Sequence, residues 1–420
     1  MEQLSYGAFS ADVHQRQSGQ RVPLQVSIEV TRRCPLECLH CYNNAAMDDL
    51  DARRRELSKE EHFRILDELV DMGCFWILFT GGEIFARKDF LEIYTYAKKK
   101  GFLITLFTNA TIMNEEIADY LAEWPPFAIE VTLYGRTRET YEALTAIPGS
   151  YDRCLRGINL LKERNLPLKL KTVATSINKH EVTSMRRFAE EELGVDFKMD
   201  GQINPRVDCS QSPLAVRLTP EEVVALDMSS PKAAAEYRKL AERDLEAANA
   251  PDADTLYSCG GGVSGFAINA YGEVGICVIS QQETFTVRQS GVRHVWEGSL
   301  LELRSRKRSK LNKCSSCRIH SLCGMCPANG ELENGDRENP VEFLCHVAHL
   351  RAATLGVDIP AHGDCEFCTG GMEHEGLMES ARRIRSKEID VETWAGPQQV
   401  FSILNNSHVT AGGCGNCGGH

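Results

Sequence analysis

The sequence lacks an excess of positive charge and lacks long apolar runs. Lys and Arg number 47 against 59 Asp and Glu, which gives a formal net charge of -12. Proteins that bind a phosphate backbone concentrate Lys and Arg, so this balance argues against a nucleic-acid partner. No run approaches the ~20 apolar residues of a membrane span, and residues 1–20 contain no continuous apolar core of a signal peptide. We therefore expect a cytoplasmic protein with no membrane partner.

Cysteine is abundant, with 17 residues in a chain of 420. In a short secreted domain such richness predicts disulfides, but in a long chain without a signal peptide it predicts metal or redox chemistry. Cys74, Cys154 and Cys209 stand alone and are predicted to be small buried side chains. The other cysteines are grouped at 34–41, at 259–345, at 365/368 and at 414/417.

Apolar strand-like runs alternate with amphipathic helical stretches in the first half of the chain. The six predicted strands are residues 25–31, 76–80, 103–108, 127–133, 168–175 and 195–199. Between the first two, Ser58 and Glu61 form a capping box and Gly73 supplies a helix stop. This alternation predicts an α/β fold with a parallel sheet, in the form of a partial (β/α)6 TIM-like barrel. Its chemistry belongs at the C-terminal ends of the strands.

Two motifs follow the ends of the first two strands and are therefore expected on the same rim. Cys34, Cys38 and Cys41 form a CxxxCxxC triplet, and Gly81-Gly82-Glu83 follows the second strand. Three thiolates so close together can hold three irons of a four-iron cluster and leave the fourth open for chemistry. A structural metal site would normally close its coordination.

These motifs, with Thr108-Asn109 after the third strand, resemble the radical S-adenosylmethionine (radical SAM) superfamily over roughly residues 21–210. The resemblance implies that Cys34, Cys38 and Cys41 bind a [4Fe-4S] cluster whose open iron takes SAM. Reduction of the cluster then cleaves SAM to methionine and a 5′-deoxyadenosyl radical that abstracts hydrogen from a substrate. The cofactors perform this step, and no further catalytic residue is assigned. An external reductant such as flavodoxin or ferredoxin is expected.

The resemblance also assigns SAM contacts. It implies that Glu83 accepts a hydrogen bond from the SAM amino group, with Gly81 and Gly82 allowing a close approach of the backbone. Ile84 stands where relatives commonly have proline, so the turn differs. The remaining implied SAM contacts are His40 beside the adenine, Asn109, Thr132 and Arg153. An exposed loop histidine, a strand threonine and a helix-start arginine are the ordinary structural alternatives for three of them.

A second set of seven cysteines resembles the SPASM extension of radical SAM maturases. The resemblance assigns one auxiliary iron-sulfur cluster to Cys314, Cys317, Cys323 and Cys345. It assigns a second to three ligands, Cys259, Cys277 and Cys326, with the fourth ligand unidentified. Two residues separate Cys323 from Cys326, where relatives usually have three. A zinc-ribbon pair of CxxC knuckles is the alternative, since zinc uses similar spacing.

The expected domains are an N-terminal extension (1–20), the radical SAM partial barrel (21–215), a helical linker (216–255), a small cysteine-rich α+β SPASM-like domain held by its clusters (256–350) and a cysteine-containing C-terminal extension (351–420) that ends in a flexible tail. In the linker, Thr219-Pro220 with Glu222 and Ser230-Pro231 each open a helix. The last segment holds the pairs Cys365/Cys368 and Cys414/Cys417, with His362 and His420 nearby in sequence. These residues are candidates for zinc, a third cluster, redox pairs or a mobile end.

The leading functional hypothesis is an oxidoreductase-type maturase that modifies a peptide or protein side chain by crosslinking, oxidation or decarboxylation. This substrate class is implied by the SPASM resemblance. The alternative enzyme is one that modifies a tetrapyrrole side chain in the haem pathway. A non-catalytic iron-sulfur electron carrier or a zinc scaffold is the alternative from another class, and it predicts no SAM cleavage.

Overall fold

The computed structural model describes residues 5–246 and 254–396. Its centre is one nine-stranded sheet in the order β6-β5-β4-β3-β2-β1-β7-β8-β9. Strands β1 to β6 pair in parallel, as the alternating pattern predicts. The strands are β1 Gln25–Glu29, β2 Trp76–Thr80, β3 Leu103–Thr108, β4 Ala128–Thr132, β5 Leu168–Val173, β6 Phe197–Asp200, β7 Gly265–Ile268, β8 Glu273–Gly275 and β9 Phe285–Thr286.

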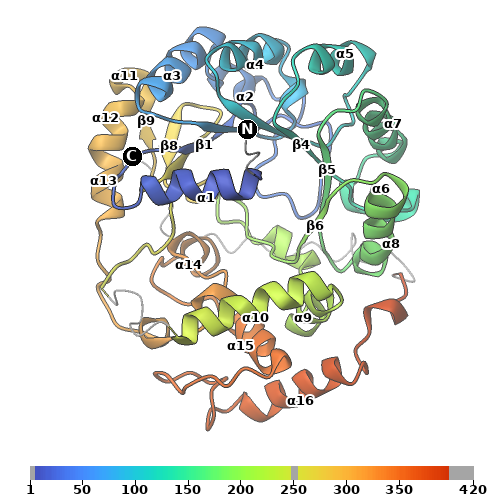
Figure 1. Ribbon diagram of the computed structural model, residues 1–420, viewed down its shortest axis with the longest axis vertical. Helices are drawn as coiled ribbons and strands as arrows, with labels where there is room; N and C mark the ends of the chain where they lie inside the picture. The colour runs from blue at the N-terminus through green and yellow to red at the C-terminus, as the bar shows by residue number, and fades with distance from the viewer. Residues whose placement is uncertain (1–4, 247–253, 397–420) are drawn as a thin grey trace.

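Helices connect successive parallel strands and cover the outer face of the sheet, while α1 crosses its other side (Figure 1). The capping boxes predicted at Ser58/Glu61 and Thr219/Glu222 are both present. The helices of the barrel are α1 Tyr6–Arg16, α2 Leu50–Arg55, α3 Lys59–Asp71, α4 Phe90–Lys99, α5 Glu115–Glu123, α6 Arg138–Thr145, α7 Ser150–Glu163 and α8 Val182–Arg187. Those that follow are α9 Pro220–Met228, α10 Pro231–Glu246, α11 Val287–Ser290, α12 Val292–Glu297, α13 Ser299–Arg304, α14 Pro327–Asn334, α15 Glu342–Leu355 and α16 His374–Arg385.

The cysteine-rich second half shares the sheet of the first half. Strand β7 pairs in parallel with β1, and β8 and β9 continue the sheet as an antiparallel hairpin extension. Below the barrel, α9, α10, α15 and α16 form a helical layer (Figure 1). Neither α1 nor α16 is foreseen by the sequence analysis. Within the described residues, none of the helices combines the length and apolarity that crossing a bilayer requires.

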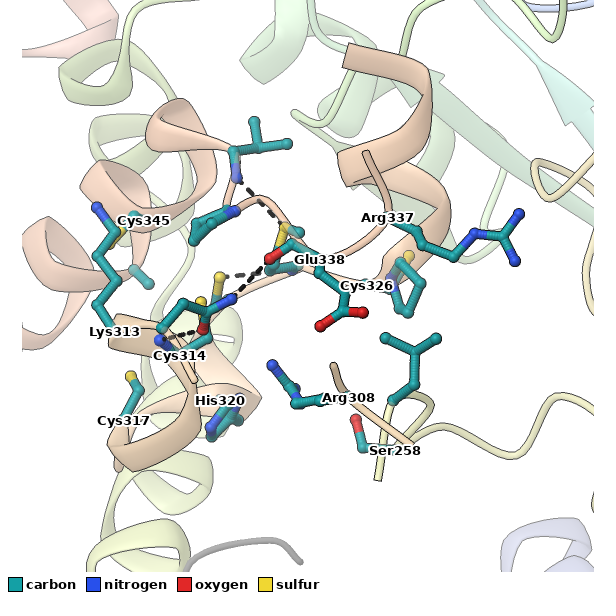
Figure 2. Close-up of a pocket in the computed structure, with 18 of the residues that line it drawn as sticks. Ser258, Arg308, Lys313, Cys314, Cys317, His320, Cys326, Arg337, Glu338 and Cys345 are labelled. Atoms are coloured by element: carbon teal, nitrogen blue, oxygen red, sulfur yellow. Dashed lines mark hydrogen bonds between the residues drawn. The ribbon is translucent and has the colours of Figure 1, made fainter. Parts of the chain in front are cut away.

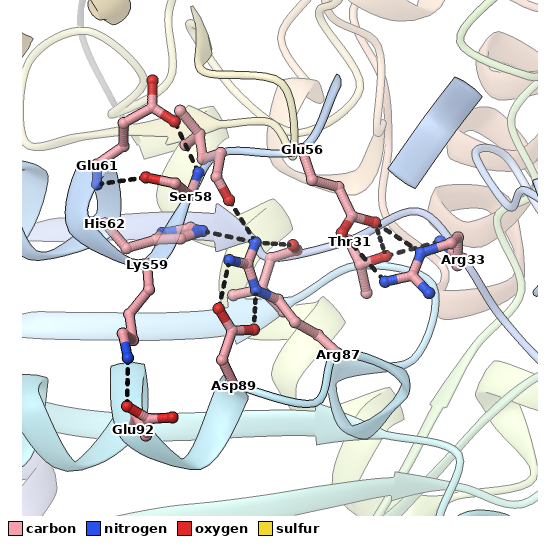
Figure 3. A network of polar contacts seen from close by, with 12 residues as sticks. Thr31, Arg33, Glu56, Ser58, Lys59, Glu61, His62, Arg87, Asp89 and Glu92 are labelled. Atoms are coloured by element: carbon pink, nitrogen blue, oxygen red, sulfur yellow. Dashed lines mark hydrogen bonds and ion pairs between the residues drawn. The ribbon is translucent and has the colours of Figure 1, made fainter. Parts of the chain in front are cut away.

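Buried ion pairs hold the loop between β1 and the three cysteines (Figure 3). Arg33 donates to both carboxylate oxygens of Glu56, at 2.9 and 3.1 Å, and Thr31 donates to the same carboxylate at 2.5 Å. Arg87 forms a bidentate ion pair with Asp89. It also donates to the carbonyl oxygens of Val30 and Leu57. The loop therefore enters the cysteine triplet in one fixed conformation.

We predict that Glu56→Ala destabilises the protein by about 3–5 kcal/mol, because it leaves the buried Arg33 guanidinium without its partner. Thermal or urea unfolding measures the change. Asp152→Ala is the matched control, since it breaks the exposed Arg138–Asp152 pair, and its Tm should stay at the wild-type value. Equal losses in the two variants would contradict the prediction.

Candidate radical site and cysteine centres

The site begins where the backbone after β2 touches the backbone after β1. Gly82 N–H donates to the Thr31 carbonyl at 2.8 Å, and Glu83 N–H donates to the Arg33 carbonyl at 3.0 Å. A Cβ on Gly81 would lie 2.1 Å from the Thr31 oxygen, and Gly81 has a φ of +143°. A Cβ on Gly82 would lie 2.4 Å from the Arg32 oxygen. Only glycine fits this approach at either position.

The three-cysteine loop leaves β1 directly beside this contact and is tied down along its length. Cys34 N–H donates to the Ala45 carbonyl and Ala45 N–H donates to the Arg32 carbonyl, which closes the loop at its base. The loop also contacts the C-terminal end of α6, where Leu39 N–H donates to the Leu144 carbonyl. Backbone bonds therefore hold the sulfurs of Cys34, Cys38 and Cys41 near one another.

The donor set of this loop fits an iron-sulfur cluster. Burial raises the pKa of all three thiols, and the negative charge of neighbouring thiolates raises it further for Cys34 and Cys38. The pKa of Cys34 is raised to about 12. Three thiolates this close and this buried need a cation to hold them, so metal binding must release their protons. The arrangement supplies three soft ligands and no fourth cysteine within the loop.

Glu83 lies at the centre of the network that joins the two motifs. Its carboxylate is fully buried and accepts hydrogen bonds from Thr108 Oγ1 at 2.8 Å and from the Asn109 N–H at 2.8 Å. Phe85 N–H donates to it at 3.2 Å. Burial raises the pKa of Glu83 to about 7, and these hydrogen bonds oppose the rise.

Asn109 connects this network to the cysteines. Its side-chain amide donates to the sulfur of Cys34 at 3.4 Å, and its side-chain oxygen accepts from Thr111. On the other side of the loop, Arg206 donates to the carbonyl of Cys41 at 3.1 Å and to Asn44. Arg206 was missed by the sequence analysis, because it lies in an irregular segment far along the chain with no local pattern around it.

The other predicted SAM contacts differ in their surroundings. His40 packs edge-on against Tyr134, with ring centroids 4.9 Å apart, and its Nδ1 is buried without a hydrogen-bond partner. Burial lowers the pKa of His40 to about 4, so the ring is neutral near pH 7. Thr132 ends β4, two residues before Tyr134 in the sequence. Arg153 lies in the first turn of α7 and donates to the Pro148 carbonyl at 3.5 Å.

Five cysteines of the second set line a cavity (Figure 2). Cys314, Cys317, Cys323 and Cys345 are among its lining residues. The pKa of Cys323 is raised to about 12 by burial and by the thiols of Cys314 and Cys317. Met325 N–H donates to the Cys323 sulfur at 3.4 Å. The tertiary structure brings these thiols to one place from three chain segments.

The remaining three cysteines of this set lie near one another. Burial raises the pKa of Cys277 to about 11, and the thiols of Cys326 and Cys259 raise it further. Cys326 also lines the cavity. The two residues between Cys323 and Cys326 are therefore enough to send the two sulfurs to different groups.

The remaining cysteines are the three single ones and the two pairs of the C-terminal extension. Cys74, Cys154 and Cys209 are buried, as predicted. Cys365 and Cys368 are also buried, and they meet His349 and His362. His349 was missed, although its place four residues after Cys345 on one helix face was a local signal. Cys414, Cys417 and His420 lie outside the described residues.

A parallel, open barrel with a glycine-cradled glutamate beside a three-cysteine loop defines a class of enzymes that use an iron-sulfur cluster at the strand ends. Residues 28–189 match the Radical SAM superfamily, so this part of the chain is a radical SAM domain. The cofactors of the superfamily are a [4Fe-4S] cluster and SAM, and the residues at the strand ends fit both.

Three relatives share part or most of the chain. Fe-coproporphyrin III synthase of Methanosarcina barkeri is 34% identical over 163 residues, a match that spans 39% of this chain and 40% of that protein. AdoMet-dependent heme synthase of the same organism is 24% identical over 75% of this chain and 94% of its own length. PqqA peptide cyclase of Bradyrhizobium diazoefficiens is 29% identical over 38% of this chain and 42% of its own length.

Among solved structures, Streptococcus suis SuiB bound to precursor peptide SuiA matches with a TM-score of 0.60. The match covers 80% of each chain at 17% sequence identity. At this identity the likeness establishes a shared fold, which extends beyond the barrel into the cysteine-rich half.

We predict that Gly82→Ala lowers stability by about 1–3 kcal/mol, because the new Cβ overlaps the Arg32 carbonyl. Unfolding measurements and the iron retained after cluster assembly test this together. Gly376→Ala on α16 is the control, since nothing lies within 4 Å of its added Cβ. A Gly82→Ala protein with wild-type stability and iron would show that the close contact is dispensable.

We also predict a pH dependence from Glu83 in the cofactor-free protein. Its pKa of about 7 lies above the ordinary 4.5, so between these values the folded state holds a proton that the unfolded chain has lost. Stability contributed by this proton is lost as pH rises toward 7. From about pH 5 to about pH 8, the Tm of wild type should fall by a few degrees relative to Glu83→Gln. A Tm difference that does not change with pH would contradict the assignment.

Proposed function

We propose that the protein is a maturase that uses SAM to modify a side chain of a peptide or protein. The observation that carries this proposal is the extent of the shared fold with SuiB, which includes the cysteine-rich half as well as the barrel. SuiB was solved with a precursor peptide. PqqA peptide cyclase, by its name, also acts on a peptide.

In this proposal each residue of the rim has a role. Cys34, Cys38 and Cys41 hold the cluster, and Glu83 receives the amino group of SAM at a place set by Thr108 and Asn109. When bound and reduced, the cluster and SAM supply a 5′-deoxyadenosyl radical for hydrogen abstraction. His40 borders the adenine as a neutral ring beside Tyr134. Gly81 and Gly82 permit the approach, and Thr132 and Arg153 contact the ribose and the carboxylate.

The cysteine-rich half is proposed to hold two auxiliary clusters. Cys314, Cys317, Cys323 and Cys345 bind one, and Cys259, Cys277 and Cys326 bind the other. Tyr42, next to Cys41, is half-buried and lies close enough to both Cys41 and Cys277 to feel their charge. The two cysteine regions thus approach one another at the end of the cysteine loop. This placement suits removal of an electron from a substrate radical, with flavodoxin or ferredoxin as the external reductant.

The open barrel supports a large substrate. The edge strands β6 and β9 do not pair with each other, so the sheet is not closed into a ring. A closed eight-stranded barrel is filled by its own side chains, whereas an unclosed one leaves lateral access to the rim. A chain segment of a peptide can enter by this route.

A second candidate substrate is a tetrapyrrole. It is favoured by the AdoMet-dependent heme synthase match, which spans 94% of that relative. Titration with coproporphyrin separates the two candidates, because porphyrin binding shifts its strong visible absorption. Peptides encoded by small neighbouring open reading frames are tested in parallel as substrates. Saturable porphyrin binding, together with no modification of these peptides, would favour the tetrapyrrole reaction.

We predict that Cys38→Ala abolishes 5′-deoxyadenosine formation from SAM under anaerobic reduction and removes about four irons per chain. Wild type should assemble about twelve irons, as three four-iron clusters. Cys74→Ala removes a buried thiol that belongs to none of the proposed cluster ligand sets, so it should keep both 5′-deoxyadenosine formation and the full iron content. Full 5′-deoxyadenosine formation by Cys38→Ala would refute the cluster assignment, and about four irons in wild type would refute the auxiliary clusters.

A further inference from the structure

A buried group of two histidines and two cysteines lies outside the radical site. His349 comes from α15, and His362, Cys365 and Cys368 come from the irregular segment before α16. One ligand atom from each residue lies within 4.8 Å of the other three. All four residues are buried, with His349 only 1% exposed. Such side chains seldom lie together in a protein interior unless something binds them.

The tautomer of His349 prepares it as a ligand. Its Nδ1 lies 2.8 Å from the carbonyl oxygen of Cys345, one turn earlier in α15, so Nδ1–H donates there. The lone pair is then on Nε2, which lies 3.4 Å from the Cys365 sulfur and 3.7 Å from the Cys368 sulfur. Metal-binding histidines characteristically donate their other N–H to a carbonyl in this way.

The distances fit one metal ion better than a cluster. Zinc–sulfur and zinc–nitrogen bonds in a tetrahedron place sulfur and nitrogen ligands about 3.6 Å apart. The third sulfur–nitrogen distance, from Cys368 Sγ to His362 Nδ1, is 3.3 Å, and the same nitrogen lies 3.1 Å from the Pro360 carbonyl oxygen, a contact that metal binding through Nδ1 must replace. A two-iron centre with two histidines binds sulfur and nitrogen on different irons, which requires longer separations.

The charge also fits. Two thiolates and two neutral imidazoles cancel the charge of a divalent ion, so the buried site is neutral once the cysteine protons are released to solvent. Cys345 borders this set, because its sulfur lies 3.6 Å from Nδ1 of His349 and forms a hydrogen bond with the Cys365 thiol. Nδ1 of His349 donates to a carbonyl and is not the ligand nitrogen, so we leave Cys345 to the auxiliary cluster.

The backbone around the two cysteines has the form of a metal-binding turn. Cys368 N–H donates to the Cys365 carbonyl, and Gly371 N–H donates to the Cys368 carbonyl. A Cβ on Gly371 would lie 2.2 Å from the Glu366 oxygen, so the turn closes tightly. Glu366, between the cysteines, pairs with Lys313 at 2.8 Å, and Lys313 directly precedes Cys314.

We propose that His349, His362, Cys365 and Cys368 form a structural zinc site that fastens the C-terminal extension to α15 and to the cysteine-rich half. The site is independent of the proposed radical reaction. It is a closed four-ligand set and takes no part in electron transfer, because zinc has no redox chemistry.

The test is the metal content of the full-length protein, prepared anaerobically with iron and zinc supplied. Elemental mass spectrometry should find about one zinc per chain in addition to cluster iron. In Cys365→Ser/Cys368→Ser the zinc content should fall at least about tenfold. Cys414→Ser/Cys417→Ser is the matched control, since it removes the other late CxxC pair, and it should keep the zinc.

Zinc-edge X-ray absorption reports the ligands separately from the iron. Wild type should show two sulfur and two nitrogen neighbours. His349→Cys keeps a complete ligand set, so it should stay folded, retain zinc and gain a third sulfur neighbour, whereas His346→Ala on the same helix should leave the spectrum unchanged. Zinc-free wild type, zinc retained by the Cys365/Cys368 variant, or an unchanged spectrum in His349→Cys would each overturn the proposal. Loss of iron instead of zinc would assign Cys365 and Cys368 to a cluster.

Discussion

The contact between the backbone of Gly81-Gly82 and the backbone of residues 31–33 is the constraint on which the radical site depends. It places the end of β2 against the entrance of the cysteine loop at a separation that excludes any Cβ. Glu83 is thereby directed toward Thr108 and Asn109, and Asn109 in turn donates to Cys34. The buried Arg33–Glu56 pair then fixes the loop from its other side. The position of the first sulfur thus follows from contacts between three neighbouring strand ends.

The continuation of the sheet has a functional consequence, because it joins the two cysteine regions rigidly. Strand β7 extends the sheet from β1, the strand that leads into the radical loop. Cys277 follows β8, and β8 is two strands from β1 in the same sheet. A flexible linker between modules would allow this separation to vary, whereas ladder hydrogen bonds keep it constant. In the proposed function, this constant separation would serve electron transfer between clusters.

In the second half of the chain, we propose that both the burial of side chains and metal binding by the cysteines stabilise the fold. This half has short strands and many irregular segments, and in the proposed function ligands as well as apolar contacts stabilise it. Neighbouring thiolates repel one another in a metal-free site, and a cation bound between them replaces this repulsion by attraction to the cation. The proposed zinc site extends the same principle to the C-terminal extension, where Cys365 and Cys368 meet α15.

By itself the sequence determined the cofactor chemistry and the barrel. Strand and helix periodicity are local, and all six barrel strands lie within a few residues of their predicted ranges, with β2 and β3 matching in full. The triplet at 34–41 also lies in one loop, so its local spacing and the family resemblance are enough to predict it as a set of ligands. The tertiary structure decided what depends on residues far apart in sequence. Arg206 beneath the cysteine loop, the pairing of β7 with β1, the separation of Cys323 from Cys326 and the meeting of His349 with Cys365 are contacts between distant segments. No local pattern encodes them, because packing and ligand geometry create them only when the chain has folded.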